Sequence, residues 1–255
     1  MFQFFNILKE RNKPLYYFGA ACVGAAVVCM VLIAASTPEV MGVNAWVKPF
    51  KFFLSSAIFA FTMGWIMFYL EEKNKVLIYS WVVIIVLAFE TIYIAYKAAI
   101  GQLSHFNISN AFNGMMFSLM GIAITILTLW TAYIGYLFFS KNFPGLPKSY
   151  VWGIRLGILF FVVFAFEGGL MAARLSHTVG AADGEAGLPL TNWSTKYGDL
   201  RVAHFLGMHS LQVLPLLSWY VARTTKTIFI AAAIYFILTS LSFAQALFGK
   251  PLFAM

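Results

Sequence analysis

The sequence predicts an all-α integral membrane protein with seven transmembrane helices, its N-terminus inside and its C-terminus outside. Hydrophobic residues make up 62% of the 255 residues and charged residues only 10%, whereas soluble domains carry roughly a quarter charged residues. Apolar runs of about 20 residues, enough to cross about 30 Å of hydrocarbon, recur along the chain. We expect one heptahelical domain over residues 1–255, with spans at about 14–35, 50–70, 76–97, 112–139, 151–173, 202–221 and 227–247.

The first of these spans resembles a signal peptide only superficially. Basic residues at positions 9–13 precede it, but its apolar run is about 20 residues long, which exceeds the apolar region of a typical signal. We therefore expect a retained helix. Cys22 and Cys29 lie seven residues apart on one face of this helix, so they are expected to be packing residues and not a disulfide framework.

The connections between spans differ on the two sides of the predicted bundle. The inner connections, such as "EEKNK" and "ARTTK", are short polar turns. The outer connection 174–201 is long and rich in glycine and aspartate, and loops above about 15 residues are usually functional or disordered. An ordered lid over a site and a flexible loop both remain open as interpretations of 174–201.

Charge placement favours the N-in topology. This topology puts ten of the 17 basic residues on the inner side, in agreement with the excess of Lys and Arg found in cytoplasmic loops. The net charge of +8 does not indicate nucleic-acid binding, because no basic cluster stands beside an aromatic platform. The expected partners are the lipid bilayer of the plasma or inner membrane and a lipophilic small molecule, with no expectation about oligomeric state.

Ionisable residues gather toward the outer face of the predicted bundle. All four histidines of the chain lie on that side, near the ends of the third to sixth spans: His105, His177, His204 and His209. Glu90 and Glu167 lie about 10 Å inside the outer ends of the third and fifth spans, at 1.5 Å per residue. A carboxylate at that depth costs several kcal/mol unless it is paired, so such residues face the bundle interior and mark functional sites.

A structural role for these charges remains open as well. A basic residue follows each glutamate by seven positions, Lys97 after Glu90 and Arg174 after Glu167. Two helical turns separate each pair, which is too far for a direct bond on one helix. Cross-pairing between helices would form a buried ion-pair network that fixes helix register and has no catalytic role.

The two histidines of the sixth span cannot both bind one ion from an unbroken helix. His204 and His209 are five residues apart, which places their side chains about 140° apart around an ideal helix. Three arrangements remain open. The chain is unwound up to His204 with Asp199 as the N-cap, a π-bulge aligns the two residues, or the two histidines serve different partners. We expect His209 to lie inward beside Gln212 and His204 to lie at the rim.

We predict a membrane metalloprotein whose leading function is enzymatic. Imidazole and carboxylate ligands suit zinc or iron, and a glutamate that is not coordinated is a candidate general base. The expected chemistry is oxidation-reduction or hydrolysis of a lipid-soluble or extracytoplasmic substrate. The predicted metal ligands are His105, His177, His204 and His209, the catalytic carboxylates are Glu90 and Glu167, and the charge-balancing or substrate contacts are Lys48, Lys51, Lys97, Arg174, Arg201 and Gln212.

Two other functions remain as alternatives. A haem-binding electron-transfer protein needs axial histidines and surface cations for the propionates, for which Lys48, Lys51, Arg174 and Arg201 are available, but no C-x-x-C-H motif is present. A proton- or cation-coupled transporter would use Glu90 and Glu167, although few polar residues continue toward the inner side. Neither a P-loop, a G-x-S-x-G motif nor a G-x-G-x-x-G motif occurs.

A weak internal similarity links two halves of the chain. Residues 89–105 and 166–177 both begin with Phe-Glu and end with Leu-Ser-His, and the spans that follow each contain Met-x-Ser-Leu. Duplication of a helical hairpin explains the pattern, and so does chance.

Overall fold

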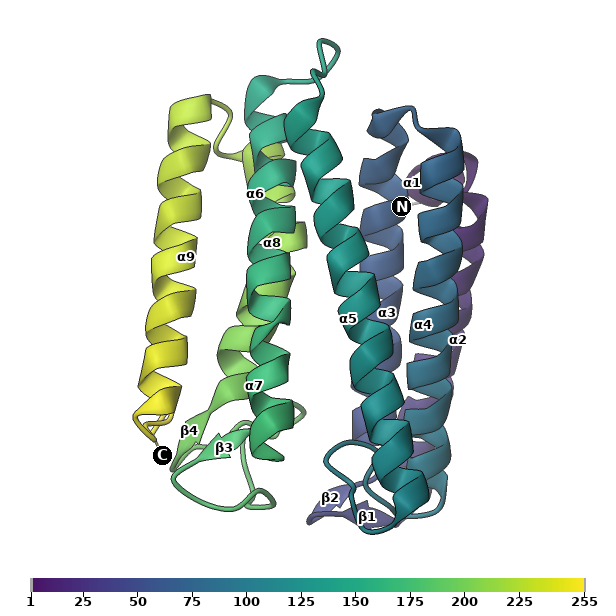
Figure 1. Cartoon of the computed structure of the whole chain (residues 1–255), viewed down its shortest axis with the longest axis vertical. Coiled ribbons are helices and arrows are strands. Elements are labelled where there is room, and N and C mark those ends of the chain that lie inside the picture. Colours follow the sequence, from purple (N-terminus) through teal and green to yellow (C-terminus); the bar gives the residue numbers. More distant parts are fainter. Residues whose placement is uncertain (1, 255) are drawn as a thin grey trace. The chain divides into compact units, whose positions relative to one another are not determined.

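The chain folds as an α-helical, multi-pass membrane protein. The computed structural model describes residues 2–254, and the chain divides into two compact units, unit 1 (Met1–Leu127) and unit 2 (Thr128–Met255). Within the described residues, six segments have the length and composition of membrane spans: Lys13–Ala35, Val47–Leu70, Lys73–Ala99, Ala111–Ser140, Lys148–Arg174 and Thr225–Leu247. Figure 1 follows these helices along the chain.

Each of the six segments overlaps a predicted span. The first is the single helix α2 (Lys13–Ala35), preceded by a short helix α1 (Phe2–Arg11) that the sequence analysis does not predict. The fifth is interrupted near its end, where one residue separates two helices. The remaining helices are α3 (Val47–Ile66), continued by the 3₁₀ turn η1 (Met67–Leu70), α4 (Lys73–Ala99), α5 (Ala111–Ser140), α6 (Lys148–Ala165), α7 (Glu167–Arg174) and α9 (Thr225–Leu247).

The predicted span 202–221 forms a helix that differs in composition from the other spans. This helix, α8 (Leu200–Tyr220), has 21 residues, but it is not among the six segments that are apolar enough to be membrane spans within residues 2–254. Arg201, His204, His209 and Gln212 all lie in its first 13 residues and lower its hydropathy. Seven spans and the orientation of the termini therefore remain predictions.

Unit 1 is built on close packing of α2 against α3, and α4 packs against both of these helices. Asn12 fixes the start of α2, because its Oδ1 accepts a hydrogen bond from Leu15 N at 3.1 Å and its Nδ2 donates to Ser80 Oγ of α4 at 2.8 Å. Cys22 and Cys29 are both buried and free on α2. They therefore act as packing residues, as predicted.

Unit 2 is built on α6 and α8, which pack more extensively than any other two helices that are described. Glycine makes this contact possible, because a Cβ at Gly157 would lie 2.9 Å from the backbone oxygen of Ser210. The hydroxyl of Ser210 donates back to Gly157 O at 2.9 Å. Small residues let membrane helices approach at backbone distance, and here they bring the first turns of α8 against the end of α6. Helix α9 packs on both α6 and α8 (Figure 1).

Both units repeat one order of elements: a helix, a two-stranded antiparallel ladder, a second helix and a third helix. The ladders, which the sequence analysis does not predict, are β1 (Glu39–Val40) with β2 (Val43–Asn44) and β3 (Thr178–Val179) with β4 (Gly198–Asp199). Asn44 and Asp199 occupy the same place at the end of the second strand. The Oδ1 of each accepts a hydrogen bond at 3.0 Å from the backbone N–H two residues later. Asp199 in this way caps α8, whereas α3 begins at Val47 without a side-chain cap.

Candidate functional site

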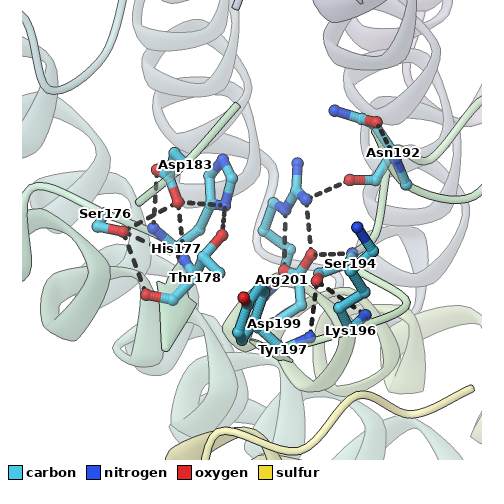
Figure 2. A network of polar contacts seen from close by, with 11 residues as sticks. Ser176, His177, Thr178, Asp183, Asn192, Ser194, Lys196, Tyr197, Asp199 and Arg201 are labelled. Atoms are coloured by element: carbon cyan, nitrogen blue, oxygen red, sulfur yellow. Dashed lines mark hydrogen bonds and ion pairs between the residues drawn. The ribbon is translucent and has the colours of Figure 1, made fainter. Parts of the chain in front are cut away.

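The long loop between α7 and α8 in unit 2 is ordered by two aspartates. Asp183 accepts hydrogen bonds from the backbone N–H groups of His177 and Thr178, at 3.2 and 2.9 Å, and from Ser176 Oγ at 2.9 Å. Figure 2 shows these contacts converging on the Asp183 carboxylate. These contacts hold residues 176–183 in a defined structure. That the loop 174–201 is a lid over a site stays a prediction.

The second aspartate, Asp199, joins the end of this loop to α8. Its Oδ2 accepts from Ser194 N at 2.9 Å and pairs with Arg201 at 2.6 Å, while its Oδ1 accepts from Arg201 Nε at 2.9 Å. Arg201 also donates to the carbonyl of Asn192 (Figure 2). Arg201 was predicted to balance a buried glutamate or to contact the substrate. In the structure it balances the carboxylate of Asp199, at the end of the loop.

His177 lies inside the Asp183 network. Its Nδ1 is 3.1 Å from Asp183 Oδ1 and 3.3 Å from Thr178 Oγ1. Burial acts to raise the pKa of Asp183, but hydrogen bonds from Thr178, His177 and Ser176 and the charge of His177 outweigh it and hold that pKa below its usual value. A cavity of about 10 Å³ lies between this network and that of Asp199, which is about the space that one water needs.

Below the loop, the fifth span is broken at Phe166. Helix α6 ends at Ala165 and α7 begins at Glu167, and the N–H of Gly169 bonds to the carbonyl of Phe166 at 3.0 Å, an i to i+3 contact that tightens the turn. Glu167 is 8% exposed. Neither of its carboxylate oxygens has a hydrogen-bond partner among the described residues.

His204 of α8 packs against this break. Its Nδ1 lies 2.7 Å from the carbonyl oxygen of Phe164. Because a carbonyl only accepts, Nδ1 carries the proton and Nε2 of the neutral ring keeps its lone pair. The ring lies over Gly168, where an added Cβ would be 3.2 Å from Cε1. His204 therefore lies against the backbone of the residue that follows Glu167.

His209, one turn further along α8, has different partners. Its Nδ1 is 3.1 Å from Gln212 Oε1, and its ring centroid is 4.3 Å from that of Phe205. Helix α8 is α-helical from Leu200 through both histidines, with Asp199 as its N-cap. Neither an unwound start nor a π-bulge occurs. Of the three predicted arrangements, the one in which the two histidines serve different partners is confirmed.

In unit 1 the predicted residues gather around the end of α4. Lys97 is 3% exposed, and its Nζ donates to Gln102 Oε1 and Asn113 Oδ1, both at 2.7 Å. Glu90, two turns earlier, is 6% exposed and interacts electrostatically with Lys48. Lys97 therefore bonds to neutral amides and not to a carboxylate.

His105 lies in the loop that follows α4. Its ring centroid is 5.4 Å from that of Phe52, and its Nδ1 is 3.1 Å from Ser104 Oγ. Burial lowers the pKa of His105 well below its ordinary value, and the positive charge of Lys48 lowers it further. His105 is accordingly a neutral imidazole at pH 7. Lys48 and Lys51 both take part in interactions within the structure.

Within the described residues no group of three or more His, Cys, Asp and Glu side chains is arranged to hold a metal ion. The arrangement does bring Glu167 and His204 to one helix break in unit 2, and Glu90, Lys48 and His105 to one end of unit 1. Arg174 lies exposed at the end of α7. The predicted ligand set as a whole stays a prediction.

Several residues that organise these regions are absent from the predicted set, namely Asp183, Asp199 as an ion-pair partner, Gln102 and Asn113. The signal for Asp183 was its position before a glycine in a polar loop, which predicts a turn but not its partners. The signal for Asn113 was a polar residue in the first turn of a span. Comparison of the chain with protein-family models, with curated proteins and with solved structures found no match, so its function is inferred from this geometry alone.

Proposed function

We propose that the chain crosses the plasma or inner membrane seven times, with the N-terminus inside and the C-terminus outside. Helix α8 has 21 residues, which is enough to cross the hydrocarbon. Its charged and histidine side chains have partners inside unit 2: Arg201 bonds to Asp199, His204 to the Phe164 carbonyl and His209 to Gln212. Seven spans put the two termini on opposite sides, whereas six put them on the same side. Cysteines introduced at Lys9 and at Lys250, labelled in intact cells with a membrane-impermeant maleimide, separate these topologies. Labelling at position 250 only is expected, and labelling at both or neither contradicts seven spans.

The proposed functional centre is a divalent metal site formed by Glu167 and His204, in a membrane enzyme that acts on a lipid-soluble or extracytoplasmic substrate. The observation that carries this proposal is the unpartnered carboxylate of Glu167, together with the oriented imidazole of His204, which packs against the neighbouring residue Gly168. A buried polar group without a partner calls for an explanation such as a bound ion. An ionised carboxylate in such a place costs several kcal/mol, and a cation removes that cost.

The orientation of His204 supports a metal over a simple structural contact. Histidines that bind metals donate the other ring N–H to a carbonyl or carboxylate, which fixes the tautomer and the direction of the ligating nitrogen. The Nδ1 contact with Phe164 O at 2.7 Å is of this kind. One imidazole nitrogen and one carboxylate suit zinc or iron. Two protein ligands leave coordination positions for a water and a substrate, as oxidation-reduction or hydrolysis requires.

Metal analysis of the purified protein tests the proposal. We expect the detergent-purified full chain to hold one equivalent of zinc or iron, and Glu167→Gln and His204→Ala each to lose most of it. Glu185→Gln is the matched control, because Glu185 is an exposed carboxylate paired only with Lys196 at 3.7 Å. Absence of metal from the wild type, together with failure to take up added zinc or ferrous iron, overturns the proposal. Matching variants of Glu90, His105, His177 and His209 test the wider ligand set.

An absorbance spectrum of the same sample tests the haem alternative. A histidine whose Nδ1 is held by a carbonyl also suits an axial haem ligand. A Soret band that persists in Glu167→Gln and disappears in His204→Ala would show that the site binds haem and not a divalent ion.

Proton- or cation-coupled transport is the second candidate, and the repeated order of elements favours it. Many transporters are built from structural repeats, and some of these repeats run parallel to one another. In this function Glu167 carries the proton. Vesicles containing the purified protein and a pH-sensitive dye would then acidify in response to a membrane potential, and Glu167→Gln would abolish the response.

A further inference from the structure

The end of α4 in unit 1 contains two buried hydrogen-bond donors that point to a ligand. Tyr93 and Lys97 lie one turn apart on one face of α4 and are 6% and 3% exposed. The Nζ of Lys97 is 5.8 Å from the centroid of the Tyr93 ring. Both side chains are held inside unit 1 and do not extend along its surface in the way that snorkelling lysines do.

The acceptors of Lys97 are held in place by a relay of side chains in the loop that follows α4. Asn113 Nδ2 donates to Ser109 Oγ at 3.0 Å, Ser109 Oγ donates to Asn107 Oδ1 at 2.7 Å, and Asn107 Nδ2 donates to Leu103 O at 2.9 Å. Because the NH₂ group of Asn113 is used by Ser109, its Oδ1 is the atom that faces Lys97. The ammonium group therefore lies in a built polar site, fixed by four neighbouring residues.

This site leaves donors unused. An ammonium has three N–H donors, and Gln102 and Asn113 accept two of them. The hydroxyl of Tyr93 is buried and lacks a hydrogen-bond partner among residues 2–254. Within the same residues no carboxylate forms an ion pair with Lys97. A buried cation and a buried hydroxyl thus share one face of a helix without an acceptor between them.

The carboxylate nearest along α4 does not serve this need. Glu90 interacts with the positive charge of Lys48, which also acts on His105. Glu90 therefore interacts with a different cation, and the Lys97 ammonium contacts two amide oxygens and the rings of Tyr93 and Tyr96, with no carboxylate among these contacts in residues 2–254. Burying an ammonium group without a counter-charge costs several kcal/mol, so an anion brought from outside the chain would be bound favourably.

We propose that Lys97 and Tyr93 bind an oxyanion group, a phosphate or carboxylate, at this end of α4. Its oxygens accept the third N–H of Lys97 and the O–H of Tyr93, as charge-assisted hydrogen bonds. The group belongs either to a free ion or to the head of an anionic lipid. This site stands on unit 1 alone and is independent of the metal proposed for unit 2.

Two probes distinguish the two sources of the anion. The full chain in maltoside detergent is mixed with inorganic phosphate, against chloride at equal ionic strength, and thermal unfolding is followed. Native mass spectrometry of the same protein measures adducts of phosphatidylglycerol against phosphatidylcholine. Thermal stabilisation by phosphate identifies a free ion as the ligand. Selective phosphatidylglycerol adducts, in a protein that phosphate does not stabilise, identify a lipid headgroup. Either result supports the site.

Variants then assign the binding to these two residues. Lys97→Met is expected to weaken binding by at least about tenfold, Lys97→Arg to retain it, and Tyr93→Phe, which removes one hydrogen bond, to weaken it by about fivefold to tenfold. Lys73→Met is the matched control, because Lys73 is exposed at the opposite end of α4, and it is expected to bind as the wild type does.

Three results overturn the proposal. They are a wild type that binds neither probe, equal binding by Lys97→Met and Lys73→Met, and equal binding by Tyr93→Phe and the wild type. The last comparison keeps the test decisive if Lys97→Met does not fold, because Tyr93→Phe leaves every contact of Lys97 with Gln102 and Asn113 intact.

Discussion

Units 1 and 2 follow the same order of helix, ladder, helix and helix, but they treat a buried charge differently. In unit 1 the ammonium of Lys97 is met by two amide oxygens at 2.7 Å. In unit 2 the carboxylate of Glu167 is equally buried, at 8% exposed, and neither of its oxygens has a partner among the described residues. The same order of elements therefore holds one buried ionisable group with two hydrogen-bond acceptors and one buried ionisable group without a hydrogen-bond partner among the described residues.

The loops explain the difference. In unit 1 two amide oxygens face Lys97, one from Gln102 in the loop after α4 and one from Asn113 in the first turn of α5. In unit 2 the long loop uses its polar groups on itself, through Asp183 and Asp199, and leaves Glu167 at the helix break without a donor. A buried ionisable group without a partner lowers stability, and such groups are concentrated at functional sites. The comparison thus points to Glu167 as the functional group and to Lys97 as a prepared binding group.

The largest expected effect tests this contrast in stability, with metal removed by a chelator. Lys97→Met leaves the amides of Gln102 and Asn113 without their donor and is expected to lower the free energy of unfolding by about 3 kcal/mol, since hydrogen bonds to charged groups contribute about 1.5–3 kcal/mol each. Glu167→Gln removes a charge that has no partner and is expected to cost nothing or to stabilise. Unfolding of both variants in detergent measures the difference.

An equal loss in the two variants would contradict the contrast, because it would mean that Glu167 has a partner of its own. Lys73→Met again serves as the control, with an expected change within about 0.5 kcal/mol for an exposed residue.

The second prediction concerns the contact of α6 with α8, which supports the helix break. Gly157→Ala would put a Cβ 2.9 Å from the backbone oxygen of Ser210, and backbone cannot move aside as a side chain can. Overpacking of this kind costs about 1–3 kcal/mol. We expect a loss of about 2 kcal/mol in thermal unfolding, together with reduced metal content if α6 and α8 position Glu167 and His204.

Gly24→Ala on α2 is the matched control for this substitution. Nothing lies within 4 Å of a Cβ at Gly24, so the substitution is expected to leave stability unchanged or slightly increased. A loss in Gly24→Ala similar to that in Gly157→Ala would mean that the close approach of α6 and α8 is not what the glycine provides.

The sequence predicted the helices well and the partners of the charges poorly, for a physical reason. Long apolar runs determine a membrane helix locally, and each of the six segments lies where a span was predicted. The partners of Lys97 and His204 depend on which helix packs against which. Small residues such as Gly157 determine this packing, and a glycine in the sequence does not reveal which polar side chains it brings together. The expectation that His209 lies beside Gln212 is confirmed, because that contact is local to one helix.

The internal similarity illustrates the same limit. The Phe-Glu and Leu-Ser-His pattern matches the third helix of unit 1, α4, to the first helix span of unit 2, α6 with α7. The order of elements instead relates α4 to α9 and α2 to α6 with α7. Asn44 and Asp199, which occupy equivalent places at the ends of their ladders, are the residues that reveal the correspondence, and two residues of related type are too few to be recognised in a sequence alone.

The third prediction tests whether Asp183 orders the loop of unit 2. Asp183→Asn keeps the shape but loses the charge and one acceptor, and it should lower the local stability of residues 176–199 by about 1.5 kcal/mol. Hydrogen exchange of peptides from this segment is expected to be about tenfold faster. Glu185→Gln removes an exposed carboxylate of the same loop and should leave exchange unchanged, since such surface ion pairs contribute about 0–1 kcal/mol. Unchanged exchange in Asp183→Asn would remove the basis for treating the loop as an ordered lid.

The smallest expected effect is a difference in pH dependence between the loops of the two units. Burial keeps the pKa of His105 well below its ordinary value of 6.5. Below pH 6.5 the unfolded chain therefore binds a proton that the folded chain does not, so stability falls as the pH falls, by at most about 1.4 kcal/mol per pH unit. Hydrogen bonds and the charge of His177 hold the pKa of Asp183 below its ordinary value of 3.8, so its contribution to stability is complete above that pH and is lost only as the pH falls below it.

Hydrogen exchange between pH 7 and pH 5, corrected for intrinsic rates, measures both loops at once. Residues 100–113 are expected to lose protection over this range, whereas residues 176–199 retain theirs until the pH falls below about 3.8. His105→Gln, which cannot titrate, should flatten the response of the first loop and leave the second unchanged. Earlier opening of residues 176–199 would reverse the comparison, because the carboxylate network of unit 2 would then be the more weakly held of the two.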